Sequence, residues 1–237
     1  MNLFFIVVLS LIFLFCIYQI IAIQWEHIRA DRLYDEAAAV YVTPGEAEAD
    51  PTSVDITALR KVNRDIIGWL LVNGTDISYP VLHTTDNEKY LTTAYDGTKS
   101  SNGSIFMNAY NAADFTDQNT LIYGHHMRDQ SMFGKLMEFE EPAFLETHRT
   151  FTVYTDNKTL RYEIFAAYVT YSASFVYSDH FDYTWDFYDY IEKSIASSIV
   201  DMQVDVTEND RIVTLSTCTS RGNRAERFVV QGRLITE

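Results

Sequence analysis

Cysteine is scarce in this chain, with only two in 237 residues. Cys16 lies inside an apolar run near the N-terminus, and Cys218 lies near the other end of the chain. The folded part therefore carries a single thiol and can form no disulfide within itself. The domain must be held together by packing.

Basic residues are few compared with acidic ones: 18 Lys and Arg stand against 33 Asp and Glu, for a formal net charge of -15. An acidic surface of this kind repels phosphate backbones and anionic headgroups. This balance argues against nucleic acid as a partner and against peripheral docking on a membrane. A positively charged partner or an amine nucleophile is not disfavoured.

Metal-ligand spacings are also missing. The adjacent histidines His125 and His126, taken with Cys218, form neither a Cys2His2 nor an HExxH pattern. We therefore predict no metal and no cofactor. The chain has no internal repeat either, so the remaining part, about 185 residues long, suits one domain.

A long apolar run is present at residues 3–23 and contains no charged residue. At about 1.5 Å per residue a helix of this length crosses a hydrocarbon core of about 30 Å. No small-x-small cleavage site follows it, so we predict an uncleaved signal anchor at 1–25. Arg29 and Arg32 follow the run and no basic residue precedes it. The positive-inside rule by itself would favour a cytoplasmic C-terminal domain, so charge alone leaves the topology open.

Two helical segments and a break separate this anchor from the rest of the chain. Residues 24–42 are rich in alanine and charge, which predicts an exposed helical stalk, and the Pro- and Gly-containing segment 43–53 predicts a linker. We assign 26–53 to this stalk and linker and 54–237 to the domain that follows. A second helix is expected over 54–63.

Eight segments with alternating, β-branched or aromatic residues predict strands. They span 68–72, 77–82, 104–108, 119–124, 150–155, 160–172, 211–217 and 227–235. Residues 184–200, between the sixth and seventh strands, have apolar positions at helical spacing. The expected fold is therefore mainly β with added helices, an eight-stranded closed or nearly closed barrel that carries its site on loops and strand ends.

Cys218 has two interpretations at this stage, as a small buried hydrophobe or as a reactive thiol. Ser216 and Cys218 share one face of a strand that ends at 218. The other face carries Val213 and Leu215, which suit the interior. We therefore expect Ser216 and Cys218 to face a groove.

The segment 119–126 places His125 at the C-terminal end of a strand, on the same side as Tyr123. Gly124 permits close approach there, and a histidine in this place suits proton transfer. His126 is expected to point to the opposite face. Periodicity alone does not bring His125 to Cys218.

Five sequence blocks, taken in order, resemble the sortases, and more closely the class B sortases. The blocks are RDIIGWLLVNGTDISYPVLHTTDNEKYL, NGSIFMNAYN, NTLIYGHHMRDQSMFGKL, TLSTC and RFVVQGRL. The resemblance implies a membrane-anchored cysteine transpeptidase with an eight-stranded sortase-type barrel, an N-terminal helical extension and a helix between strands 6 and 7. It also implies a catalytic domain outside the cell membrane and a cytoplasmic N-terminus.

The resemblance assigns the catalytic residues to Cys218 of TLSTC, His125 of YGHH and Arg227 of RFVV. A thiol with a reference pKa of about 8.5 needs a cationic neighbour to act as thiolate, which protonated His125 can supply. Arg227 stays charged and can hydrogen-bond a tetrahedral oxyanion. Arg221 and Arg224 also follow the cysteine, but they lie in a predicted turn where solvent-facing charge is expected.

The implied reaction cleaves a C-terminal sorting signal of the NPxTN or NPxTG kind after Thr, through a thioester on the cysteine. An amine of peptidoglycan or of its lipid-linked precursor then accepts the surface protein. Four residues are expected to bind substrate: Ser216, Tyr123, Asn111 and Phe115. A cysteine peptidase that only hydrolyses, or a noncatalytic surface binding module, remain the alternatives. Papain-like enzymes place Cys before His, the reverse of the order here.

Overall fold

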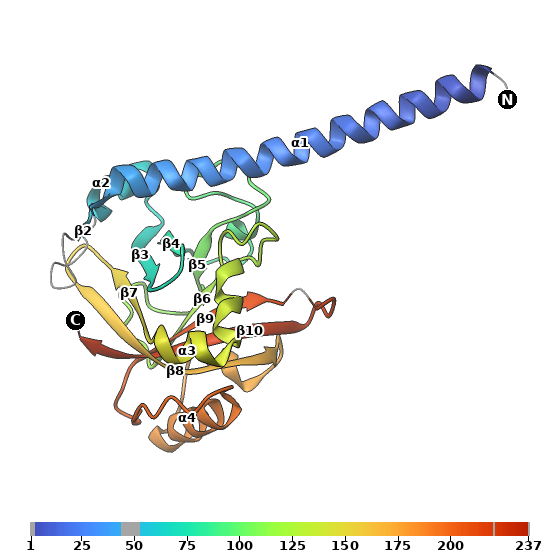
Figure 1. Cartoon of the computed structure of the whole chain (residues 1–237). Coiled ribbons are helices and arrows are strands. Elements are labelled where there is room, and N and C mark those ends of the chain that lie inside the picture. The colour runs from blue at the N-terminus through green and yellow to red at the C-terminus, as the bar shows by residue number, and fades with distance from the viewer. Residues whose placement is uncertain (1–2, 44–52, 220, 237) are drawn as a thin grey trace.

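Eight strands close into one barrel in the computed structural model, which describes residues 3–43, 53–219 and 221–236. The strands are β3 Ile66–Val72, β4 Ser78–Leu82, β5 Ile105–Met107, β6 Asn119–Tyr123, β7 Thr150–Tyr154, β8 Thr159–Tyr171, β9 Ile212–Cys218 and β10 Glu226–Thr236. Their order around the barrel is β10-β8-β7-β3-β4-β5-β6-β9. Neighbours are antiparallel, except that β4 with β5 and β6 with β9 run parallel. The closed eight-stranded barrel confirms the predicted fold (Figure 1).

The helices lie outside the barrel and at its connections. They are α1 Leu3–Tyr41, α2 Ile56–Val62, α3 Pro142–Thr147 and α4 Thr184–Ser197, with 3-10 turns η1 Lys89–Leu91, η2 Gly134–Glu140 and η3 Phe175–Tyr177. A short ladder pairs β1 Val42–Thr43 with β2 Ser53–Val54. Most of the predicted linker, residues 44–52, lies outside the described residues.

The alternation predicted for β9 is confirmed by what each face packs against. Val213 and Leu215 are fully buried in the main core of the barrel. Ile212, on the other face, belongs to a second apolar cluster with Phe187 and Ile191 of α4. Both faces of β9 are therefore covered along most of the strand, and the strand reaches solvent only at its end.

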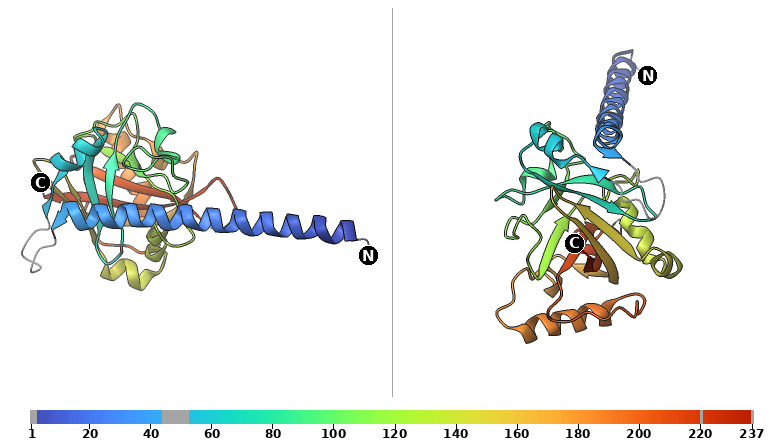
Figure 2. Two further views of the ribbon diagram at one scale, coloured as in Figure 1. Left: turned by 90° about the horizontal axis from the view of Figure 1, so that it is seen from above. Right: turned by 90° about the vertical axis from the view of Figure 1, so that its left-hand side faces the viewer.

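The helix α1 is continuous over 39 residues, but its two parts differ in their surroundings. Its apolar N-terminal part projects away from the barrel, and its C-terminal part lies along one side of it (Figures 1 and 2). Ala30, Tyr34 and Ala37 recur at helical spacing and are 6%, 4% and 2% exposed. The predicted exposed stalk is wrong for this face of the helix, because its small residues and one tyrosine pack on the domain.

The end of β9 and the start of β10 lie on the side of the barrel toward which the N-terminal part of α1 projects. This relationship is visible in Figure 1 and in the left-hand view of Figure 2. Because the two views are perpendicular, they place this barrel end and the projecting helix on one side of the molecule.

Candidate active site

Cys218 and Arg227 face each other across two neighbouring strands. Cys218 is the last residue of β9 and is exposed, and the antiparallel ladder pairs it with Arg227, near the start of β10. Residues directly opposite in an antiparallel pair extend their side chains on the same face of the sheet. The thiol and the guanidinium therefore share one face at one end of the barrel.

His125 lies at the same end of the barrel, on the other side of β9 from Arg227, so the three residues form one row across adjacent strands. The strands β6 and β9 are parallel, and their register ends with Tyr123 beside Ser216. The alignment continues beyond β6, because the Gly124 amide donates to the Ser216 carbonyl at 3.2 Å and the Thr217 hydroxyl donates to the Gly124 carbonyl at 2.9 Å. The next residue, His125, follows at the level of Cys218. The barrel thus brings the three predicted catalytic residues to adjacent strand ends.

Hydrogen bonds to backbone carbonyls hold the two basic side chains. The Arg227 Nη1 donates to the carbonyls of Arg224 and Glu226 at 2.7 and 3.0 Å. The His125 Nε2 lies 2.8 Å from the carbonyl of Leu91. Both side chains are half-buried. Each side chain keeps further nitrogens that these bonds do not use.

Tyr177 is a member of this site that sequence reasoning missed. Its hydroxyl lies 2.8 Å from the Ser216 hydroxyl, and its ring stacks on that of Tyr123 with centroids 6.3 Å apart. Burial raises the pKa of Tyr177, while the Ser216 hydrogen bond and the charge of Arg227 act to lower that pKa and Cys218 acts to raise it. The tyrosine therefore lies close to both groups. It comes from a one-turn 3-10 element that carries no periodic signal.

Ser216 and Tyr123 lie next to the row, beneath Tyr177. Ser216 is only 3% exposed, so Tyr177 covers the face that was expected to form an open groove at this position. Tyr123 is half-buried, and its ring also contacts that of Phe106, with centroids 5.5 Å apart. Burial raises the pKa of Tyr123, so it is a neutral hydroxyl at physiological pH. Both residues support the floor of the site.

Asn111 and Phe115 do not fit their predicted role in substrate binding. Asn111 is 4% exposed; its amide donates to Asp117 and to the Asn119 carbonyl, and it accepts from the Leu121 amide. Phe115 is 1% exposed and belongs to the main core. These side chains brace the segment between β5 and β6, which explains their polar and aromatic character without a ligand.

The rival residues named from the sequence have other surroundings. Arg221 forms an ion pair with Glu140, and Arg224 is exposed and offers its backbone carbonyl to Arg227. His126 forms an isolated bridge with Met132. Among the described residues, no three His, Cys, Asp or Glu side chains lie together in a way that could hold a metal ion.

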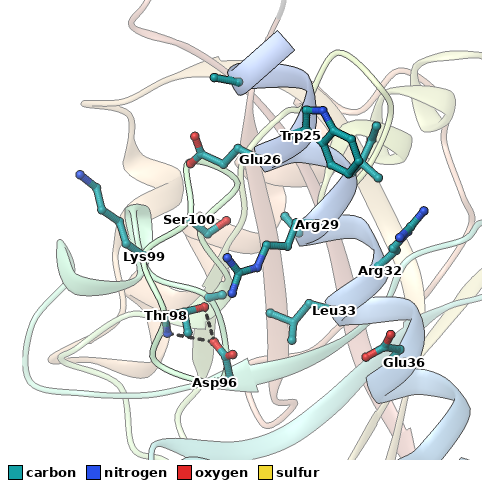
Figure 3. Close-up of a pocket in the computed structure, with 14 residues that line it drawn as sticks. Trp25, Glu26, Arg29, Arg32, Leu33, Glu36, Asp96, Thr98, Lys99 and Ser100 are labelled. Atoms are coloured by element: carbon teal, nitrogen blue, oxygen red, sulfur yellow. Dashed lines mark hydrogen bonds between the residues drawn. The ribbon is translucent and has the colours of Figure 1, made fainter. Parts of the chain in front are cut away.

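A hollow of about 750 Å³ lies between α1 and the segment 94–100. In Figure 3, Arg29 and Leu33 of the helix face the segment that carries Asp96 and Thr98. Asp96 accepts hydrogen bonds from the amide and the hydroxyl of Thr98. Cys218, His125 and Arg227 do not line this hollow, which marks where the helix meets the domain.

Comparison with known proteins identifies the family. A family model described as the sortase domain matches residues 70–235. The chain therefore belongs to the sortase family, and it is an enzyme of the transpeptidase kind that this family comprises.

The matching branch of the family is class B. Sortase B of Listeria monocytogenes is 37% identical over 233 residues, which cover 95% of this chain and 93% of the relative. Sortase B of Staphylococcus aureus is 34% identical over 181 residues, covering 75% and 73%. The crystal structure of sortase B from B. anthracis in complex with AAEK1 has a TM-score of 0.79 at 29% identity, covering 90% and 99%. A Staphylococcus aureus sortase B-substrate complex has a TM-score of 0.77 at 27% identity, with the same coverage. The class B resemblance is confirmed.

Proposed function

We propose that this class B sortase cleaves a sorting signal of the NPxTN or NPxTG kind after its threonine and transfers the surface protein to a cell-wall amine. One observation carries the assignment of the reacting groups: the register of β6, β9 and β10 brings His125, Cys218 and Arg227 to adjacent strand ends. A nucleophile, a proton donor and a fixed cation in one row are the parts that acyl transfer through a thioester needs.

The first half-reaction forms the thioester. The Cys218 thiolate attacks the threonine carbonyl, and the Arg227 guanidinium hydrogen-bonds the oxyanion of the tetrahedral intermediate. The C–N bond then breaks, and protonated His125 gives its proton to the departing amine. The products are an acyl-enzyme and the free C-terminal tail of the signal.

The second half-reaction makes the new amide. An amine of peptidoglycan or of its lipid-linked precursor attacks the thioester carbonyl and loses a proton to neutral His125. The C–S bond breaks and the Cys218 thiolate is restored. No nucleotide is consumed because the thioester keeps the acyl group activated between the two steps. The acidic surface does not repel an amine acceptor.

The apolar helix supports a location at the cell membrane. The part of α1 that projects from the barrel has a mean hydropathy of 2.8 in its most apolar window, and none of that window is buried. The proposed topology is single-pass, with a cytoplasmic N-terminus and an extracellular catalytic domain. The end of β9 and the start of β10, which carry Cys218 and Arg227, lie on the side toward which this helix projects (Figure 1), so a helix set in the bilayer would hold this end of the barrel toward the membrane. Membrane-borne sorting signals and lipid-linked amines would both approach from that side.

A fluorogenic NPxTN peptide, assayed with the full-length protein in detergent, tests the proposal. We expect cleavage, a faster turnover with added amine, and a new peptide–amine product. The Cys218→Ala protein should lose all cleavage, and Arg224→Ala should stay within about twofold of wild type, since the Arg224 contact uses its backbone carbonyl. Cleavage unchanged by any amine would instead indicate a peptidase, and retained cleavage by Cys218→Ala would refute the mechanism.

A further inference from the structure

The bond between His125 and Leu91 decides which ring nitrogen can exchange a proton. The Nε2 of His125 lies 2.8 Å from the Leu91 carbonyl. A carbonyl oxygen only accepts hydrogen bonds, so Nε2 must carry the hydrogen in the neutral ring as well as in the protonated one. Nδ1 is then the nitrogen that gains and loses a proton. The position of one backbone carbonyl therefore bears directly on acid–base chemistry.

The segment that carries this carbonyl is anchored on one side by Asp65. The Lys89 ammonium and the Tyr90 hydroxyl both donate to one oxygen of Asp65, at 2.6 and 2.7 Å. Tyr90 is 1% exposed and belongs to the main core. The 3-10 turn η1, which ends at Leu91, is thus fixed to the residue just before β3.

A second turn, residues 100–104, holds the segment from the other side. The Ser104 amide donates to the Tyr90 carbonyl at 2.9 Å, and the Ser104 hydroxyl donates to the carbonyl of Thr93 at 2.7 Å. Gly103 has a φ of +58°, and a Cβ atom built on it would lie 2.5 Å from the Tyr90 oxygen and 2.8 Å from the Leu91 oxygen. Only glycine lets this turn approach both carbonyls so closely.

The helix α1 is hydrogen-bonded to the turn 100–104. The Tyr34 hydroxyl donates to the Gly103 carbonyl at 2.7 Å and lies 3.0 Å from the Ser104 hydroxyl. Nearer the apolar part of the helix, the His27 Nδ1 lies 2.8 Å from the Asn102 side-chain oxygen. Glu26 accepts from the Ser101 amide at 3.1 Å, and Figure 3 shows its side chain beside this turn.

We infer that Leu91, Gly103 and Tyr34 form a positioning chain in which α1, through the turn 100–104, holds the Leu91 carbonyl against His125. The inference rests on the proposed role of His125 as the proton donor. It assigns to α1 a contribution to catalysis besides that of an anchor, because the helix with the apolar segment also supports the partner of the catalytic imidazole. The three residues are positioning residues, and none of them needs to touch the substrate.

Two glycine variants test the positioning chain. A Cβ at Gly103 must push the Leu91 carbonyl away, whereas Gly97, with a similar left-handed φ of +87°, has nothing within 4 Å of the added atom. We expect Gly103→Ala to lower kcat for peptide transfer by about tenfold with KM within about twofold, since proton transfer and not binding is affected. Gly97→Ala also places an alanine at a positive φ but meets no neighbouring atom, so it should keep its kcat. Equal kcat values in the two variants would overturn the inference.

The imidazole tautomer gives a readout that does not depend on turnover. Nitrogen NMR of labelled His125 should show the Nε2–H form in the wild-type and Gly97→Ala proteins, and a mixture of tautomers in Gly103→Ala. The measurement can be made in a Cys218→Ala background, so it remains informative if the proposed reaction is wrong. An Nδ1–H tautomer in the wild type would overturn the inference.

Tyr34→Phe tests the link to α1 and serves if Gly103→Ala fails to fold. It removes one hydroxyl and keeps the ring that packs on Tyr79 and Tyr95. We expect kcat to fall by about threefold, which corresponds to the loss of one hydrogen bond. The tautomer signal of His125 should shift toward a mixture, as in Gly103→Ala. Tyr41→Phe is the control, because within the described part of the chain its hydroxyl makes no hydrogen bond. A Tyr34→Phe protein with wild-type kcat and the wild-type tautomer would show that α1 does not help to position His125.

Discussion

Arg227 stands directly opposite Cys218 in the antiparallel ladder between β10 and β9. The guanidinium is oriented by two bonds to backbone carbonyls, which leaves its remaining donors to an oxyanion. We predict that Arg227→Lys lowers kcat/KM about 100-fold, because an ammonium cannot keep these bonds and donate in the same plane. Peptide-transfer kinetics measure this, with Arg224→Ala as the matched control. A lysine variant within twofold of wild type would show that charge alone suffices at this position.

Gly124 sets how closely the His125 segment approaches the core. An added Cβ would lie 2.4 Å from a methyl carbon of Ile105 and 2.7 Å from the ring of Phe133. Gly124→Ala should lower the free energy of unfolding by about 1–3 kcal/mol, as overpacking does, and should reduce kcat because the strand end moves. Urea unfolding and kinetics on the same preparation check both effects. Adding Phe133→Leu to this variant should restore part of the lost stability. A Gly124→Ala protein as stable and as active as wild type would contradict the packing described.

Ala37 tests whether the C-terminal part of α1 is packed on the domain or is a free stalk. Ala37 is 2% exposed in the main core, whereas Ala39, two residues further along the same helix, is exposed. Ala37→Leu should destabilise the protein by about 1–3 kcal/mol in urea unfolding, and Ala39→Leu should have little effect. Equal unfolding midpoints for the two variants would indicate an undocked helix.

Two tyrosines beneath α1 predict how stability depends on alkaline pH. Burial raises the pKa of Tyr79 and of Tyr95 to about 12. A raised pKa stabilises the folded state fully below the unfolded value of about 10, and this contribution is lost as the pH rises through about 12. Unfolding free energies in urea should therefore fall between pH 10 and 12 by up to about 2 kcal/mol for each tyrosine. Tyr79→Phe should remove its share of this slope, and an unchanged slope in that variant would contradict the assignment.

The strands, and the positions of the three proposed catalytic residues at strand ends, were predictable because their signals are local or come as ordered blocks. Alternation identified both faces of β9, and the blocks around His125, Cys218 and Arg227 carried the family resemblance. The register that brings these residues together joins segments more than 90 positions apart, which periodicity alone cannot supply. The structure provides it through the parallel pairing of β6 with β9.

The failures have a common physical cause, which is tertiary contact. Alanines and charges at 24–42 are typical of an exposed helix, but the small side chains of Ala30 and Ala37 also allow close packing. Asn111 and Phe115 lie near the site in sequence, yet hydrogen bonding and burial direct them inward. Tyr177 was missed because a one-turn element has no period, and its importance follows only from the groups that surround it.

The most direct test of the account is mass spectrometry of the acyl-enzyme. The full-length protein, in detergent, is incubated with an NPxTN peptide without an amine, quenched in acid and digested. We predict an adduct on Cys218 equal to the peptide portion that ends at Thr, less one water. The adduct should disappear when an amine is added, as the peptide–amine product forms. Cleaved peptide without an adduct on Cys218, or an adduct that no amine removes, would contradict a transpeptidase that works through this thiol.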